Sequence, residues 1–157
     1  MPQPAELIDV LGATNHRIIV SMGPQHELLR LAPNMWGAEF LPQPVILPLV
    51  DLVITHGGNN TVTECLHHGK PMILLPLFWD QHDNAQRIDE TGFGVHLPTY
   101  AFAEADLQAA IDRLTADEAL AERLRAVSAR LHADPGTERA AGLIERLAAE
   151  RAPIPRD

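Results

Sequence analysis

The chain has 157 residues, of which 46% are apolar and 21% are charged, and this composition predicts a globular domain and excludes a disordered segment. Its net charge is −9 and the sequence shows no cluster of basic residues, so nucleic acid is not an expected partner. Cys65 is the only cysteine, which excludes a scaffold stapled by intrachain disulfides. The first residues lack the features of a signal peptide, and no apolar run approaches the ~20 residues that span a bilayer. We therefore expect a soluble, cytoplasmic chain.

The hydrophobic pattern predicts helices and short strands that alternate along the chain. In chain order we expect a helix over 5–12 that ends at Gly12, a strand over 17–21, one or two helical turns over 27–31, a weaker strand over 35–40, a stronger strand over 52–55, a helix over 61–68, a strand over 72–75, a helix over 80–91, a strand over 94–97, and helix from 103 onward with a break at 134–136. These elements form one predicted domain over 1–151, and 152–157 is expected to be a tail.

Strands and helices at this spacing predict an α/β fold with a Rossmann-like, doubly wound parallel sheet and C-terminal helices. Such sheets bind ligands at the carboxyl ends of their strands, beside the N-termini of the following helices. The loops 56–60 and 76–80 both follow predicted strands, so we expect them to face the same crevice.

The first of these loops has the chemistry of a diphosphate site. Gly57 and Gly58 allow a tight turn and a close approach of the backbone to a ligand. The unpaired N–H groups and the dipole of the following helix favour an anion without a lysine, and His56 adds a donor. Glu64, one turn into the helix, suits the two hydroxyls of a ribose. The alternative is a plain structural turn with a helix cap at Asn59–Thr61.

The second loop carries Asp80 and Gln81, an acceptor and a mixed donor–acceptor that suit the hydroxyls of a sugar. Phe78 and Trp79 place two apolar rings on the same loop. Asp80 could equally serve only as a helix cap, with Asp83 in the first turn.

The third segment is Phe40-Leu41-Pro42-Gln43. An aromatic ring at Phe40 can stack on a nucleobase, and Gln43 can bond the base edge or the ribose. The alternative for Phe40 is an ordinary place in the core. Two further site classes find no support: Cys65, His67, His68 and His82 lack the paired spacing of a zinc site, and no nucleophile elbow of the Gly-x-Ser-x-Gly type occurs.

Together these segments resemble the donor-binding signature of the UDP-glycosyltransferases, which are inverting enzymes of the GT-B fold. The resemblance runs over some forty residues through Phe40–Gln43, His56–Thr61 with Glu64, Gly69–Met72, Pro76 and Asp80-Gln81. Asn59 stands where plant members have tryptophan, and this part is more similar to bacterial macrolide-type members.

The resemblance implies a role for each matching position. Phe40 takes the place of a base-stacking tryptophan, and Gln43 that of a glutamine on the base or ribose. The residues that contact the diphosphate in the family match His56, Gly58, Asn60 and Thr61. The carboxylate that binds the ribose hydroxyls matches Glu64, and the two residues that hold the donor sugar match Asp80 and Gln81. The expected donor-binding residues are Phe40, Gln43, His56, Gly57, Gly58, Asn59, Asn60, Thr61, Glu64, Trp79, Asp80 and Gln81. No cofactor or metal is expected.

In the family, an N-terminal domain holds the acceptor and a general base; we expect this chain to lack that domain and so to contain no catalytic residue. We also expect it to lack the strand that precedes its first helix. Either the chain is a fragment of a longer protein, or a partner supplies the missing strand and domain. In a sheet of order 3-2-1-4-5-6 that strand is central, and its loss leaves a gap bordered by unpaired backbone groups. The expected partners are therefore a UDP- or TDP-sugar, a separate N-terminal domain or subunit, or a second copy that associates through this gap.

Two alternatives remain for the function. The chain could be a noncatalytic nucleotide-sugar-binding subunit, or a relative of the lipid-linked GlcNAc transferase, although the aromatic-x-Pro-Gln element favours the first family. For a single donor site of any kind, Gly58 and Gln81 must lie on the same side of the molecule. A helical stripe at Leu120, Leu124, Val127 and Leu131 is interpreted as core-facing or as a partner surface.

Overall fold

The computed structural model describes residues 4–150, and the predicted tail over 152–157 lies outside this range. Seven α-helices and two short 3₁₀ segments occur within it. The helices are α1 (Pro4–Gly12), α2 (Gln43–Ile46), α3 (Asn59–His67), α4 (Asp80–Glu90), α5 (Glu104–Ala116), α6 (Glu118–Ala133) and α7 (Gly136–Glu150), and the 3₁₀ segments are η1 (His26–Leu28) and η2 (Leu47–Leu49).

The strands form two parallel sheets. One sheet pairs β1 (Ile18–Ser21) with β2 (Met35–Ala38), and the other has the order β3 (Val53–Thr55), β4 (Met72–Leu74), β5 (Gly94–His96). All three pairings are parallel. The prediction of a parallel α/β fold with C-terminal helices is therefore confirmed, with strands one or two residues shorter than expected.

Two local features differ from the prediction. Helix α2 and segment η2 were not expected, because Pro44 and Pro48 obscure the helical pattern; both prolines lie in the first turn, where a missing N–H is tolerated. The C-terminal helical region has a second break, at Asp117. This residue ends α5 and caps α6, since its side chain accepts a hydrogen bond of 2.8 Å from the Leu120 amide.

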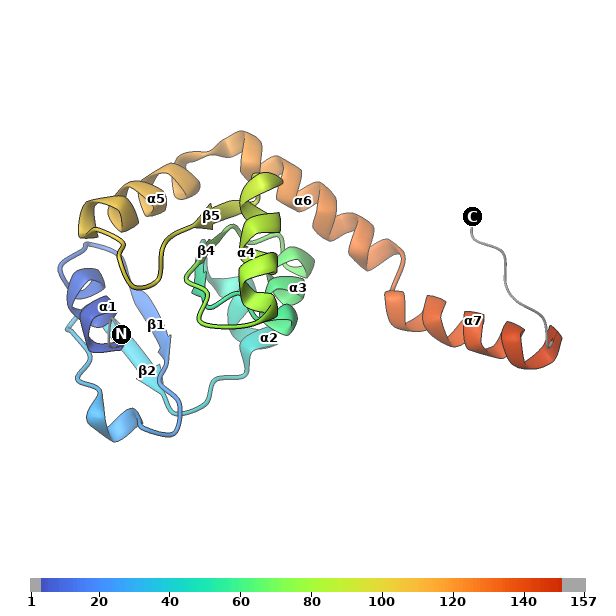
Figure 1. The fold of residues 1–157 in the computed structure, drawn as a ribbon, viewed down its shortest axis with the longest axis horizontal. Helices are drawn as coiled ribbons and strands as arrows, with labels where there is room; N and C mark the ends of the chain where they lie inside the picture. Colours follow the sequence, from blue (N-terminus) through green and yellow to red (C-terminus); the bar gives the residue numbers. More distant parts are fainter. Residues whose placement is uncertain (1–3, 151–157) are drawn as a thin grey trace.

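Strand β4 lies at the centre of the core because both of its faces are covered. On one face Ile73 and Leu75 pack with apolar side chains of α1, α5 and α6, and on the other Met72 and Leu74 pack with α3 and α4. A strand buried on both faces is expected to be apolar throughout, as residues 72–75 are. Figure 1 shows α5 and α6 running in succession along one side of the molecule.

A gap separates the two sheets, at the position where the sequence analysis expects one strand to be lacking. β1 and β3 are not paired with one another, and a cavity of about 170 Å³ lies between them. Its lining comes from both strands and from the α2–η2 segment, and includes Ile19, Ser21, Val53 and Ile54. Each of these strands therefore presents an unpaired edge to the cavity, which suits the addition of a parallel strand.

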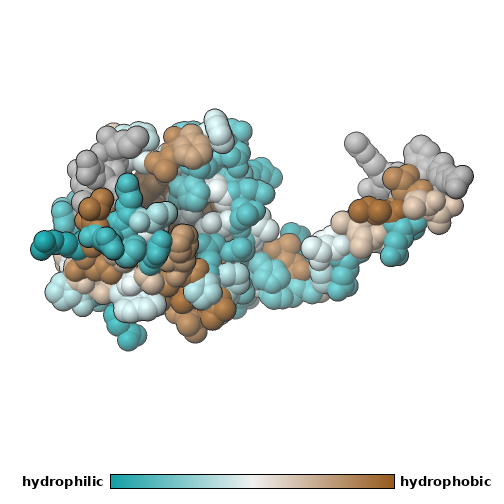
Figure 2. All heavy atoms as spheres, turned by 90° about the horizontal axis from the view of Figure 1, so that it is seen from below, coloured by the Kyte–Doolittle hydropathy of each residue, from teal (hydrophilic) through white to brown (hydrophobic). Residues whose placement is uncertain are grey.

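The C-terminal helices divide into a packed part and a projecting part. In the predicted stripe of α6, Leu120 and Leu124 are buried in the core, while Val127 and Leu131 are half-buried. Helix α7 extends away from the rest of the molecule (Figure 1). Its exposed apolar residues, visible in Figure 2, are Leu143, Ile144 and Leu147. None of the described helices is long and apolar enough to cross a membrane.

The close packing of β5 against β4 generates a stability prediction. A Cβ at Gly94 would overlap the carbonyl oxygen of Met72 and lie 2.8 Å from the Ile88 side chain. We expect Gly94→Ala to destabilise the fold by about 1–3 kcal/mol or more, as overpacking of a core does. The matched control is Gly142→Ala in α7, where nothing lies within 4 Å. Equal unfolding midpoints for the two variants in urea would contradict this packing.

Candidate functional site

The parallel register places both candidate loops at one edge of the second sheet. Thr55, Leu74 and His96 are register partners at the carboxyl ends of β3, β4 and β5. The loop from His56 to Gly58 leaves β3 at this edge, and the loop from Leu75 to Trp79 leaves β4 at the same edge. The two loops are therefore neighbours, as the sequence predicts.

Gly57 is the point at which the first loop packs on the second. It is buried and has φ +85°, a conformation that only glycine adopts readily. A Cβ here would lie 3.1 Å from Leu74 and 3.2 Å from the carbonyl oxygen of Gln81. Gly58 and Gln81 thus lie on the same side of the molecule, which is the condition that a single donor site imposes.

A side chain from α4 links the glycine loop to the first turn of that helix. Asn84 Nδ2 donates a hydrogen bond of 2.9 Å to the carbonyl oxygen of Gly57 and a longer one, of 3.4 Å, to Oδ2 of Asp80. Thr55 supports the other side of the turn, because its hydroxyl oxygen accepts a 3.3 Å hydrogen bond from the Gly57 amide. The glycine loop is therefore held by one side chain from β3 and one from α4.

Helix α3 begins directly after the glycine loop, with Gly58 as its N-cap and no side chain capping it. Its first amides lack intrahelical partners and lie at the positive end of the helix dipole. Asn59 and Asn60 are exposed in this first turn, and His56 is exposed beside it. A Cβ at Gly58 would lie 2.6 Å from Nε2 of His56, so the imidazole covers the glycine closely. This arrangement can bind an anion through neutral donors.

Gln43 and Glu64, two of the predicted base and ribose residues, are in direct contact. Gln43 Nε2 donates a hydrogen bond to Oε2 of Glu64 and another, of 3.3 Å, to the hydroxyl of Thr61. This contact occupies one of the two carboxylate oxygens of Glu64. The structure thus brings Gln43 and Glu64 together although 21 positions separate them in the sequence. Gln43 lies on α2, the short helix that the sequence did not predict.

The predicted sugar pair divides in the structure. Asp80 is exposed, whereas Gln81 is only 4% exposed, and its Oε1 accepts hydrogen bonds from the amides of Leu77 and Phe78 at 2.9 and 3.2 Å. Thr99 adds a third restraint on this loop, since its hydroxyl donates to the Pro76 carbonyl at 2.6 Å. The side-chain oxygen of Gln81 therefore stabilises the loop that precedes α4.

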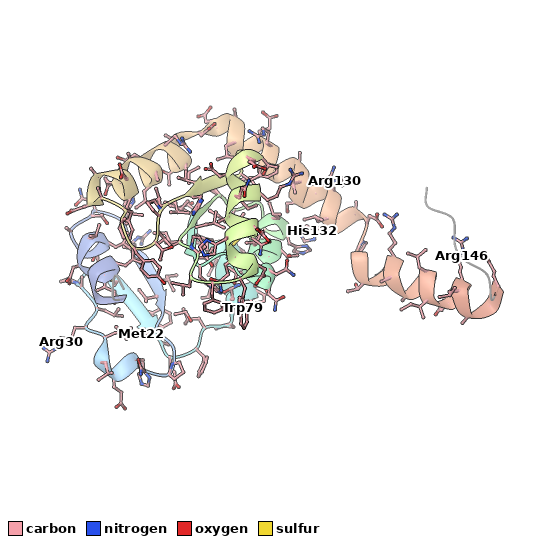
Figure 3. The ribbon with its side chains drawn as sticks, viewed as in Figure 1. Met22, Arg30, Trp79, Arg130, His132 and Arg146 are labelled. Carbon is pink, nitrogen blue, oxygen red and sulfur yellow. The ribbon has the colours of Figure 1, made fainter. Side chains whose placement is uncertain are left out.

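Three aromatic side chains stand out around the site. Phe40 is 72% exposed and Trp79 is 83% exposed, so neither belongs to the core. Phe78 packs edge-on against Trp79, with ring centroids 5.1 Å apart. Trp79 has φ 51°, which is strained for a bulky residue. Figure 3 shows Trp79 at the N-terminal end of α4.

Cys65 and the histidines do not form a metal site. Residues 4–150 contain no group of three or more His, Cys, Asp or Glu side chains arranged to hold a metal ion. Cys65 is fully buried in the apolar cluster between α3 and β4. His67 stacks on His132 of α6 with centroids 3.8 Å apart. Burial and the neighbouring charges of His67, His132 and Lys70 lower the pKa of His68.

The comparison with known families agrees with this geometry. The family profile described as "Erythromycin biosynthesis protein CIII-like, C-terminal domain" matches residues 5–147. The chain belongs to this family. It is thereby a C-terminal domain of the GT-B glycosyltransferases, as the resemblance at the donor signature implied.

Similar proteins include bacterial and mammalian glycosyltransferases. The chain is 32% identical over 132 residues to the NDP-glycosyltransferase YjiC of Bacillus subtilis (strain 168), a match that covers 82% of this chain and 34% of the relative. It is 38% identical over 110 residues to UDP-glucuronosyltransferase 1A6 of Oryctolagus cuniculus, covering 69% of this chain and 20% of the relative. The chain therefore spans about a third of the length of the first relative and a fifth of the second.

A solved structure supports the same fold. The glycosyltransferase of kitacinnamycin superimposes with a TM-score of 0.81 at 32% sequence identity, over 89% of this chain and 37% of that one.

Sequence reasoning missed three residues that shape the site of this glycosyltransferase domain: Thr55, Asn84 and Thr99. Asn84 could have been found, because it lies one helical turn after Asp80 and so shares its face. Thr99 had no local signal, since it reaches Pro76 only through the pairing of β4 and β5.

The environment of Cys65 generates a prediction about its reactivity. Burial raises the pKa of its thiol to about 12, with a further contribution from the charge of Glu64. Since the thiolate is the reactive form, we expect no reaction with a chromogenic disulfide reagent at pH 8 in the folded chain, and full reaction in denaturant. Rapid reaction of the folded chain would show that α3 opens away from β4.

Proposed function

We propose that this domain binds the nucleotide-sugar donor of an inverting glycosyltransferase. The proposal rests on one observation: the glycine loop at the N-terminus of α3 contacts the first turn of α4, which carries Asp80 and Gln81, at the shared edge of the sheet. A single extended ligand can therefore contact both. The donors that YjiC and UDP-glucuronosyltransferase 1A6 carry in their names, NDP- and UDP-sugars, support a UDP- or TDP-sugar here.

In this proposal the donor lies across the N-terminus of α3. The diphosphate lies against the amides of Gly58 to Thr61 and the ring of His56, where no lysine or metal ion is required. The ribose hydroxyls bond to Glu64, whose carboxylate Gln43 already orients, and the base stacks on the exposed ring of Phe40. The sugar extends toward Asp80, Trp79 and the amide nitrogen of Gln81.

The proposed reaction follows from this placement. An acceptor hydroxyl attacks the anomeric carbon while the bond to the diphosphate oxygen breaks, and the electron pair leaves with the nucleotide diphosphate. Preorganised N–H donors at the N-terminus of α3 stabilise the charge that develops on the leaving group. A general base takes the hydroxyl proton. We assign that base to a second half of the enzyme, which also binds the acceptor.

The same partner explains the divided sheet. A parallel strand between β1 and β3 would fill the cavity of about 170 Å³ and pair both free edges. We propose that this strand comes with the acceptor-binding half, either from the same polypeptide or from a separate subunit, and that copies of the isolated domain otherwise associate through this gap. The buried free thiol of Cys65 is compatible with the reducing cytoplasm, which we propose as its compartment.

The ribose contact generates a binding prediction. We expect Glu64→Ala to weaken binding of a UDP- or TDP-sugar by about 1–3 kcal/mol, the usual loss for a charged hydrogen bond. Calorimetric titration of the domain with both nucleotide sugars measures it. Glu122→Ala, at an exposed position on α6, is the matched control and should bind as the unmodified chain does. Unchanged affinity in Glu64→Ala would remove this carboxylate from the site.

The open edges of β1 and β3 generate a prediction about the isolated chain. We expect it to self-associate, or to unfold over a broad and weakly cooperative transition, because two strand edges remain unpaired. Light scattering with size-exclusion chromatography gives the mass, and thermal denaturation gives the cooperativity. A monomer with a sharp, reversible transition would argue against the need for an added strand.

A further inference from the structure

Asn84 is half-buried in α4 and takes part in neither the core nor the predicted donor set. Its amide nitrogen carries two hydrogens, which matches its two acceptors, the Gly57 carbonyl at 2.9 Å and Asp80 Oδ2 at 3.4 Å. One side chain therefore contacts the loop assigned to the diphosphate and the carboxylate assigned to the sugar.

The bond to Gly57 determines the direction of the next amide. A trans peptide is planar, so the C=O of Gly57 and the N–H of Gly58 point in opposite directions. Because Asn84 holds the carbonyl toward α4, the Gly58 N–H points away from α4. Within the described part of the chain this N–H has no hydrogen-bond acceptor, so it is free to bind a ligand.

The same peptide would rotate easily without this restraint. It is flanked by two glycines, which lack a Cβ and allow conformations that other residues resist. Rotation by half a turn would place the Gly57 carbonyl where the Gly58 N–H now lies. An anion at the N-terminus of α3 would then face a negative dipole end in place of a positive one.

We propose that Asn84 is a positioning residue for the donor: it holds the Gly57–Gly58 peptide with its N–H available to the diphosphate, and it orients Asp80 in register with it. This inference rests on the proposed function and extends it to a residue outside the donor contacts. The distance between the loop assigned to the diphosphate and the carboxylate of Asp80 is then set by the side-chain amide of Asn84.

The test measures the affinity for a diphosphate separately from that for a nucleoside. UDP and uridine, and TDP and thymidine, are titrated into the unmodified chain, into Asn84→Ala and into Asn84→Leu, which is closer to asparagine in size. We expect the Kd of the diphosphate to rise about tenfold in both variants, the order expected for one lost hydrogen bond with its unpaired partner. The nucleoside Kd should stay within about twofold, because the base and ribose contacts are assigned to Phe40, α2 and α3 and not to α4.

The matched control is Gln86→Ala, which removes an exposed amide two residues further along α4 whose partner is Glu90. It should leave both affinities unchanged. Thermal unfolding of every variant separates lost stability from lost positioning, since a merely structural role would lower the melting temperature without changing the ratio of the two affinities. Equal ratios in the Asn84 variants and the unmodified chain would overturn the role of Asn84 alone. An unmodified chain with no preference for diphosphate over nucleoside would overturn the proposed function and this role together.

Discussion

The site depends on the close approach of two backbone segments at Gly57. The parallel register of β3 and β4 brings two loops to one edge, but only a residue without a Cβ and with positive φ lets them touch. This contact holds the N-terminus of α3, the carboxylate of Asp80 and the amide of Asn84 close together. A larger residue at this position would move the glycine loop away from Leu74 and Gln81.

Core packing and site geometry are joined through β4. One face of this strand supports α1, α5 and α6, and the other supports α3 and α4, the helices whose N-termini form the site. Helices α3 and α4 therefore pack on a strand whose opposite face is covered by α1, α5 and α6.

Much of this was predictable from sequence because the signals are local. Apolar runs marked every strand, and the motif over 40–81 marked the loops, since glycine, proline and helix-capping residues act within a few positions. Helix α2 was missed because its prolines obscure the helical pattern. The break at Asp117 was missed because the helical pattern continues across this residue and only its capping side chain marks the boundary. The hydrogen bonds of Asn84 to Gly57 and of Thr99 to Pro76 were not predictable, because each depends on how distant elements pack. The burial of Gln81 was also missed, although its hydrogen bonds reach residues only three and four positions away.

Trp79 has a further consequence for how this domain balances folding against recognition. A bulky residue held at φ 51° raises the free energy of the folded chain by about 1–3 kcal/mol relative to a relaxed backbone. Glycine would relieve this strain, and most of the ring it would remove lies in solvent, where it contributes little to the core. The folded state is thus less stable than the fold alone allows, and what the domain retains in exchange is an exposed indole at the N-terminal end of α4.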